Sequence, residues 1–211
     1  MIKKIRMLFS TLIFIVNYFF FVIVFALIIL MHCIIIVFQY TVAGSFAKKN
    51  PFGLIKNMLP AYATAIGTQS SAATIPVTVA ATKKNGVSDQ IAEFVCPLCA
   101  TIHLSGSTIT LTSCAIAIMM LNGWTVSLAG LFPFILMLGV TMVAAPGVPG
   151  GAVMAALGIL ESMLGFNEPM LALMIALYIA QDSFGTACNV TGDGAIAVLM
   201  DAITSKKANK A

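Results

Sequence analysis

Between Glu93 and Glu161 the chain runs for 67 consecutive residues without an Asp, Glu, Lys or Arg. Over the whole sequence 60% of the residues are hydrophobic and 9% are charged, whereas a soluble domain carries roughly 25% charged residues. No water-soluble core of this size buries such a stretch, but an apolar outer surface is stable in lipid. The sequence therefore predicts an all-α polytopic membrane protein, since helices satisfy their own backbone hydrogen bonds in a bilayer.

The few charges of the chain gather in short groups. Eleven basic and seven acidic residues give a net charge of +4 (11 − 7). Basic clusters in the loops and termini of membrane proteins favour the cytoplasmic side, so residues 206–211 are predicted to form a basic cytoplasmic tail. The clusters lack the interleaved aromatic residues of a stacking surface, and nucleic acid is not expected as a partner. The five cysteines lie in apolar stretches and are predicted to be packing residues.

Residues 7–47 contain no charged residue and are dense in Phe, Ile, Leu and Val. A single membrane span needs about 20 residues, so this stretch is predicted to be one long tilted helix or two tight ones. Lys3, Lys4 and Arg6 resemble the charged start of a secretory signal. The apolar run is too long for a signal and lacks an evident small-residue cleavage site near its start. Residues 1–49 are therefore expected to be retained in the membrane.

The following segment is apolar but rich in small and polar residues. Residues 61–81 contain many Ala, Thr and Ser, the run Gln69-Ser70-Ser71, and Pro76. Backbone that leaves the helical conformation at membrane depth persists only where protein or a cavity surrounds it. We therefore predict a re-entrant helical hairpin over about residues 54–82, with its tip near residues 70–72.

This hairpin begins a pattern that occurs twice. The further expected elements are a broken helix over residues 91–122 with its interruption at 103–107, a second hairpin at about 128–165 with its tip at 146–151, and a second broken helix over 170–201 with its interruption at 182–194. Paired interrupted segments indicate a transporter site at the interface between repeats. Residues 50–205 are therefore predicted to form one transport domain. Tolerated Gly and Pro kinks are the alternative for any single interruption.

Four polar residues near the C-terminus share one face of a helix. Asp182, Thr186, Asn189 and Asp193 follow one another at spacings of four, three and four residues, which places them in a narrow stripe. Carboxylates at membrane depth need a partner or water, and carboxylate and carbonyl oxygens suit a hard cation. The stripe therefore predicts a cation-binding face, with a solvated helix end as the alternative interpretation.

The Gly-rich tips are suited to a second kind of binding. Unwound segments present backbone carbonyls to a cation, and the N-terminal ends of half-helices present N–H groups to a carboxylate. His103 lies in the interruption of its span, where it is expected to pack, to relay a proton or to contact a substrate. The residues placed to bind a carboxylate are Ser70, Ser71, Gly147, Val148 and Gly150.

Four motifs carry a resemblance to a known family. The motifs are TQSSAATIP at residues 68–76, ATIHLSG at 100–106, GVPG at 147–150 and NVTGD at 189–193. They resemble the dicarboxylate/amino acid:cation symporter family, which includes the glutamate transporters, and the match runs from about residue 43 to residue 203. The resemblance implies a homotrimeric elevator transporter, in which two re-entrant hairpins and two broken helices form the moving transport domain.

The resemblance assigns substrate-binding roles along the chain. Ser70 and Ser71 match substrate-contacting serines of the first hairpin, and residues 147–150 match the second hairpin, which acts as the gate. Asp182 matches the aspartate that binds the substrate ammonium, and Thr186 is expected beside it in the same site.

The chain departs from the family pattern at two positions that concern the substrate. Gly185 stands where acidic-substrate members carry the Arg that pairs with the substrate side chain. Gln69 replaces the other family arginine, in the first hairpin. Gly185 is kept in the predicted substrate site, and a neutral amino acid is expected to be preferred over glutamate or aspartate.

The predicted ion site also follows the family in part. Asn189 matches a residue that serves both substrate and sodium binding, and Asp193 matches a sodium-ligating carboxylate. The broken-helix motif, usually Asn-Met-Asp-Gly, reads His103-Leu-Ser105-Gly here, so His103 and Ser105 stand at departed ligand positions. Sodium is the expected coupling ion, a proton is the alternative, and no other cofactor is expected.

The sequence thus predicts a multi-pass plasma-membrane symporter of an amino acid or dicarboxylate, and not an enzyme. Because family members are about twice as long, the chain is expected to be a C-terminal portion. An intramembrane aspartyl protease is an alternative, but it needs its two carboxylates within a few ångströms. Asp182 and Asp193 are 11 residues apart, about 16 Å along a helix. A non-transporting membrane subunit is the third interpretation.

Overall fold

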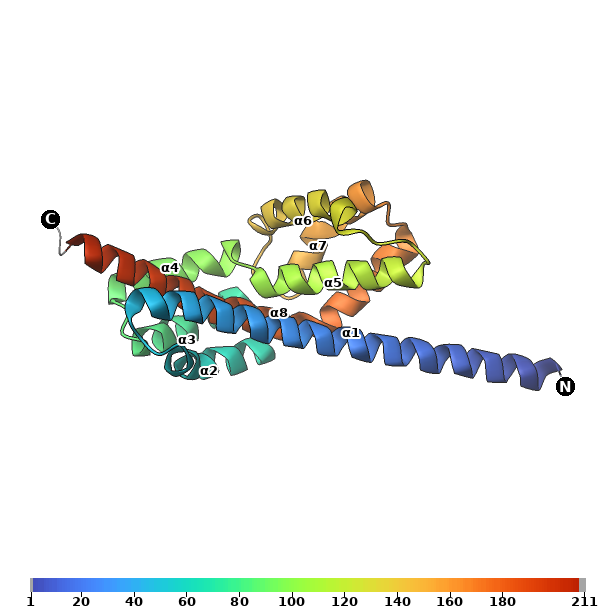
Figure 1. Ribbon diagram of the computed structural model, residues 1–211, viewed down its shortest axis with the longest axis horizontal. Helices are drawn as coiled ribbons and strands as arrows, with labels where there is room; N and C mark the ends of the chain where they lie inside the picture. Colours follow the sequence, from blue (N-terminus) through green and yellow to red (C-terminus); the bar gives the residue numbers. More distant parts are fainter. Residues whose placement is uncertain (1, 209–211) are drawn as a thin grey trace.

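A computed structural model describes the backbone of residues 2–208 and the side chains of residues 18–205. The described part is all-helical and contains no strand. Its elements are α1 (Ile2–Ala47), α2 (Pro51–Thr68), α3 (Ser71–Lys84), α4 (Asp89–Ile102), α5 (Ser105–Leu121), α6 (Leu128–Met142), α7 (Gly151–Leu164) and α8 (Glu168–Ala208). In Figure 1, α6 and α7 lie on one side of the long α1 and α8, and α2 and α3 lie on the other.

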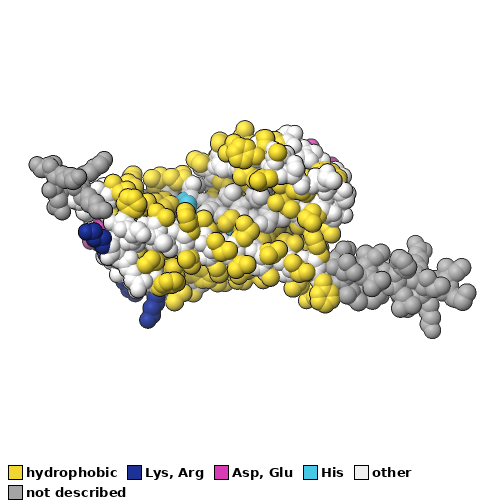
Figure 2. Space-filling view, in the orientation of Figure 1, with side chains coloured by type: hydrophobic (Ala, Val, Ile, Leu, Met, Phe, Trp, Pro, Cys, Tyr) yellow, Lys and Arg dark blue, Asp and Glu magenta, His cyan; other side chains and the backbone are white. Residues whose placement is uncertain are grey.

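Three helical stretches of the described chain are long and apolar enough to cross a membrane, namely Tyr18–Ala47, Asp89–Leu121 and Glu168–Ser205. The first belongs to α1, a single continuous helix, so the first of the two arrangements expected for residues 7–47 is the one observed. Hydrophobic side chains are spread over the face shown in Figure 2, and the basic side chains on that face gather at one end. Many exposed hydrophobic residues are large, such as Phe38, Phe132 and Val140. An apolar surface of this extent marks contact with lipid or protein. The chain is a membrane protein.

Helices α2 and α3 form a helix–turn–helix. Asn50 caps the start of α2 by accepting a hydrogen bond from the backbone N–H of Phe52, and Pro51 fits the first helical position. Gln69 then takes a left-handed conformation with φ 53°, and the Ser70 side chain caps α3. The turn therefore falls at residues 69–70, one residue before the tip that the sequence predicts.

The other predicted interruptions differ from one another. Helix α4 ends at Ile102 and α5 begins at Ser105, so the break expected at residues 103–107 is a short extended link at His103 and Leu104. Helices α6 and α7 are joined by residues 143–150, which contain the predicted second tip. Gly150 takes φ 71° there, a conformation that glycine adopts without a steric penalty.

Helix α8 corrects one sequence-level expectation. The break predicted at residues 182–194 is absent, because α8 is helical throughout Glu168–Ala208. Its polar side chains find partners without unwinding: Thr191 donates to the carbonyl of Ala187 within the helix, and Asn189 bonds to α5. Gly192 and Gly194 lower helix propensity by only about 1 kcal/mol each relative to Ala, and packing offsets that amount.

Two apolar clusters flank the middle of α8. The first contains α8 residues from Met170 to Tyr178 and packs against α5, α6 and α7. The second contains α8 residues from Ala187 to Val198 and packs against α1, α2 and α4. The polar residues of α8 therefore lie at the junction of the two clusters, where three chain interruptions converge.

Candidate substrate and ion site

The tips of the two helical hairpins touch each other. The Ser70 hydroxyl donates to the carbonyl oxygen of Gly147 at 2.7 Å, and the backbone N–H of Ala72 donates to the same oxygen at 3.2 Å. The Gly147 backbone is tightly enclosed, because an added Cβ would lie 2.8 Å from the Ala100 carbonyl oxygen. These contacts join segments 77 residues apart in sequence and close the space between the tips.

A small cavity of about 10 Å³ lies behind this contact. A water molecule needs about 10–15 Å³, so an amino acid enters only if the tips separate. Asp182 is the only charged side chain in the lining, and no Lys, Arg or His contributes to it. The lining residues are Gln69, Ser71, Leu104, Ser107, Pro146, Gly147, Val148, Ala152, Tyr178, Asp182, Thr186 and Asn189.

The Asp182 carboxylate is held against the start of α7. The backbone N–H of Gly150 donates to its Oδ2 atom at 2.7 Å, and the Thr186 hydroxyl lies 3.4 Å from Oδ1. The side chain is 4% exposed. The first N–H groups of a helix lack intrahelical acceptors and favour negative charge, so Asp182 satisfies an amide that would otherwise need another acceptor.

Asn189 holds the start of α5 in the same way. Its Oδ1 atom accepts from the backbone N–H groups of Gly106, at 2.8 Å, and Ser107, at 3.3 Å. Its Nδ2 atom donates to the Ser107 hydroxyl at 2.8 Å. The side chain is buried, and its oxygen already has two donors.

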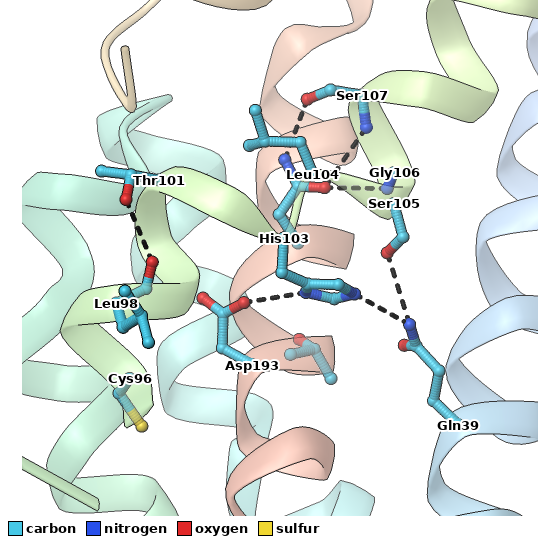
Figure 3. A network of polar contacts seen from close by, with 12 residues as sticks. Gln39, Cys96, Leu98, Thr101, His103, Leu104, Ser105, Gly106, Ser107 and Asp193 are labelled. Atoms are coloured by element: carbon cyan, nitrogen blue, oxygen red, sulfur yellow. Dashed lines mark hydrogen bonds and ion pairs between the residues drawn. The ribbon is translucent and has the colours of Figure 1, made fainter. Parts of the chain in front are cut away.

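Asp193, His103 and Gln39 form a separate polar chain (Figure 3). The Nδ1 atom of His103 lies 2.9 Å from Asp193 Oδ1, and its Nε2 atom lies 3.0 Å from Gln39 Nε2. Gln39 also lies 3.5 Å from the Ser105 hydroxyl. These residues come from α1, from the α4–α5 link and from α8, so the chain joins three distant segments.

Comparison with known proteins decides the family. Residues 8–203 match the sodium:dicarboxylate symporter family. The chain belongs to this family. Neutral amino acid transporter A of Homo sapiens is 32% identical over 166 residues, which are 78% of this chain and 31% of that protein. Neutral amino acid transporter B(0) of Rattus norvegicus is 31% identical over 149 residues, 70% of this chain and 27% of that protein.

A third relative of the symporter family carries a different name. Excitatory amino acid transporter 5 of Homo sapiens is 32% identical over 160 residues, which are 75% of this chain and 28% of that protein. The chain therefore spans about a third or less of the length of these relatives.

The symporter family raises the question of whether this site fits sodium. Hard cations take several oxygen ligands, but the Oδ1 atom of Asp193 is paired with an imidazole nitrogen. The Asn189 oxygen is occupied by two backbone donors. The described residues contain no group of three or more His, Cys, Asp or Glu side chains suited to a metal ion. In this arrangement Asp193 Oδ1 and Asn189 Oδ1 are occupied by hydrogen-bond partners rather than free for a sodium ion.

The structure sorts the predicted site residues into four groups. Ser70 and Gly150 are not in the cavity lining but hold it closed through their hydrogen bonds. Gly185 faces α5, since a Cβ there would lie 3.4 Å from the Thr110 hydroxyl and 3.6 Å from the Ser107 nitrogen. His103, Ser105 and Asp193 lie apart from the lining, whereas the remaining predicted substrate residues line it: Ser71, Gly147, Val148, Asp182, Thr186 and Asn189.

Several lining residues were not among the predicted site residues. Tyr178 precedes Asp182 by one helical turn, so the helical stripe extended by four residues would have included it. Ser107 lies one residue beyond the ATIHLSG motif. Leu104, Pro146 and Ala152 are apolar, and no feature of their types or spacing distinguishes them from packing residues. Gln69 stood out only as the replacement of a family arginine.

Proposed function

We propose that this protein is a secondary active transporter that moves a small amino acid or dicarboxylate across the membrane, with neutral amino acids preferred. The observation that carries the proposal is the closed cavity between two hairpin tips, in which Asp182 is the only charged side chain and accepts the Gly150 amide. A solute site that is sealed by contacts between movable tips suits alternating access. The names of the relatives, which are amino acid transporters, support the same class of solute.

An amino acid would use the charges of this site as follows. Its carboxylate would take the Gly150 amide at the start of α7, which now bonds to Asp182. Asp182 would then be free to accept hydrogen bonds from the substrate ammonium. Entry of such a solute requires the Ser70–Gly147 contact to open, which makes the α6–α7 tip the gate.

The composition of the cavity supports the preference for neutral substrates. A second carboxylate on the substrate would be buried beside Asp182 without a cationic partner, because no basic side chain lines the cavity. Burying an unpaired charge costs several kcal/mol. Small uncharged side chains such as those of serine, threonine or alanine need no such partner.

The proposal includes a membrane arrangement and a coupling ion. The two hairpins are proposed to be re-entrant, the membrane to be the plasma membrane, and the whole protein to be a homotrimer. Coupling to a cation is proposed on the family resemblance, with sodium favoured and a proton as the alternative. The Asp193 Oδ1 atom is paired with His103 Nδ1, so no step of the proposal is assigned to an ion there.

The geometry disfavours the protease alternative. A shared-proton carboxylate pair needs its members within a few ångströms. Asp182 and Asp193 lie on one continuous helix, which separates them by about 16 Å along its axis. Each carboxylate also has its own partner, Gly150 for one and His103 for the other.

Direct binding to the full chain tests the proposal. The purified protein in nanodiscs is titrated calorimetrically with L-serine, L-threonine, L-alanine, L-aspartate and succinate. We expect a neutral amino acid to bind, and aspartate to bind at least about tenfold more weakly, a difference of about 1.4 kcal/mol. The absence of binding by all five solutes would overturn the proposal. Uptake of the tightest ligand into vesicles then separates a transporter from a non-transporting subunit.

A further inference from the structure

The Asp193 carboxylate already has a donor in place. Asp193 is 1% exposed, and its Oδ1 atom lies 2.9 Å from His103 Nδ1. The other ring nitrogen is held by Gln39 of α1 at 3.0 Å. In Figure 3 the imidazole lies between the two side chains, with one nitrogen directed at each.

The direction of the hydrogen bond to Asp193 follows from its partners. A carboxylate only accepts, so the Nδ1 atom of His103 carries the hydrogen and donates it. The Gln39 amide nitrogen only donates, so Nε2 accepts from it. With the Gln39 amide in this orientation, a neutral imidazole satisfies both contacts.

The backbone of α8 leaves room for this ring. A Cβ added at Gly192 would lie 2.4 Å from His103 Cε1 and 2.7 Å from Gln39 Oε1. Any side chain at residue 192 would therefore displace the ring or its partner. The glycine beside Asp193 and the amide from α1 both fit an imidazole at this position, and they do so independently of the hydrogen bond to Asp193.

Two of the oxygens near Asp193 are already engaged by donors, while the buried Gln39 Oε1 has no hydrogen-bond partner among the described residues. Asn189 Oδ1 accepts two backbone N–H groups of α5, and Ser105 Oγ lies 3.5 Å from Gln39 Nε2. The imidazole N–H is thus the group that satisfies the buried Asp193 carboxylate.

We propose that His103 is an ion-specificity residue. Its N–H occupies the position beside Asp193 that a cation would otherwise take, so sodium does not bind there. Removal of the ring should open the position: an Asn at residue 103 offers a carbonyl oxygen to an ion beside Asp193. The inference about sodium does not depend on a substrate. Its extension to substrate binding rests on the proposed function.

The first experiment measures sodium binding without any substrate. Thermal unfolding of the full chain in nanodiscs is followed during titration with NaCl, with choline chloride at equal ionic strength as reference. We compare the unmodified protein, Asp193→Asn, His103→Asn and the double variant His103→Asn/Asp193→Asn. A ligand that binds only the folded state raises the midpoint in a saturable manner, by about 2 °C or more near saturation.

Any saturable sodium effect on the midpoint of the unmodified protein should persist in Asp193→Asn. His103→Asn should acquire a sodium-dependent rise, and the double variant should lose it again. A saturable rise in the unmodified protein that disappears in Asp193→Asn would overturn the inference. A folded His103→Asn variant that remains indifferent to sodium would also overturn it, because removal of the ring would then open no position for a cation.

The second experiment extends the test to the substrate. The dissociation constant of the tightest neutral amino acid is measured in NaCl and in choline chloride. Introduced alone, Asp193→Asn should leave the ratio of the two constants within about twofold of its value in the unmodified protein. His103→Asn should increase this ratio about tenfold. If no amino acid binds, the proposed function fails, but the unfolding titration still decides the role of His103.

Discussion

The Asp182 carboxylate accepts the backbone N–H of Gly150 at 2.7 Å, which ties the middle of α8 to the first residue before α7. This amide is where a substrate carboxylate is proposed to bind, so Asp182 and the substrate compete for one donor. The competition links binding to the position of the hairpin tip. A solute that takes the amide releases α7 from α8, and its ammonium restores a partner to Asp182.

The first prediction concerns the charge of Asp182. Asp182→Asn keeps the shape and an oxygen acceptor for Gly150 but removes the charge that pairs with the ammonium. Loss of a charge-assisted hydrogen bond costs about 1.5–3 kcal/mol, so the dissociation constant for L-serine should rise about 10- to 150-fold. Calorimetry with L-serine measures the change, and an unaltered constant would contradict the assigned role. Ethanolamine, which lacks the carboxylate, serves as a control ligand and should bind weakly to both proteins.

The second prediction concerns selectivity at Gln69. This residue lines the cavity and donates to the Ser183 hydroxyl at 2.8 Å. Gln69→Arg should bring a guanidinium to the rim of a site that lacks a basic group, and a guanidinium matches a carboxylate bidentately. We expect the ratio of L-serine to L-aspartate affinity to fall by about tenfold or more. Gln69→Met, of similar length and without charge, is the matched control. An equal ratio in both variants would place the substrate side chain away from this residue.

The third prediction concerns the two backbone N–H groups of α5 that Asn189 Oδ1 accepts. Asn189→Ala leaves the backbone N–H groups of Gly106 and Ser107 buried without an acceptor, which costs about 1–3 kcal/mol for each group. Asn189→Asp keeps the acceptor, and the start of α5 offsets part of the cost of burying its charge. The thermal midpoint should therefore fall much more in the Ala variant than in the Asp variant. Equal midpoints would mean that other groups or water satisfy these amides.

The sequence predicted much of the architecture because its signals were local. The charge-free stretches indicated membrane helices, and the polar run at Gln69-Ser70-Ser71 located a chain turn to within a residue. The spacing of Asp182, Thr186 and Asn189 placed three side chains on one helical face, and the structure brings all three to one cavity.

The incorrect or missing predictions concern partners that are distant in sequence. The residues of α8 between 182 and 194 resemble an unwound segment, but α5 supplies the acceptors and donors that keep the helix intact. Gln39 lies within the predicted apolar span of residues 7–47, yet it contacts His103, 64 residues away. Residue types and spacing do not reveal such pairings, because they depend on how α1 packs against α8.

The last prediction concerns the close approach of α5 and α8 at Gly106. A Cβ on this residue would lie 2.4 Å from the Gly185 carbonyl oxygen and 2.6 Å from Cys188 Cβ. Neither atom belongs to the flexible end of a side chain, so Gly106→Ala must push the helices apart and weaken the bond from the Gly106 amide to Asn189. Overpacking typically costs about 1–3 kcal/mol and sometimes more, and we expect a loss at or above the upper end of this range.

Gly158→Ala is the matched control for this last prediction. Gly158 lies within α7, and a Cβ there would meet nothing within 4 Å. Ala is favoured over Gly inside a helix by roughly 0.5–1 kcal/mol, so this variant should unfold at the same temperature as the unmodified protein or slightly higher. Thermal unfolding in nanodiscs compares the two variants directly. Equal midpoints for Gly106→Ala and Gly158→Ala would show that α5 and α8 do not meet at Gly106, and the position assigned to Asn189 would fail with it, because the same contact brings its side chain to the start of α5.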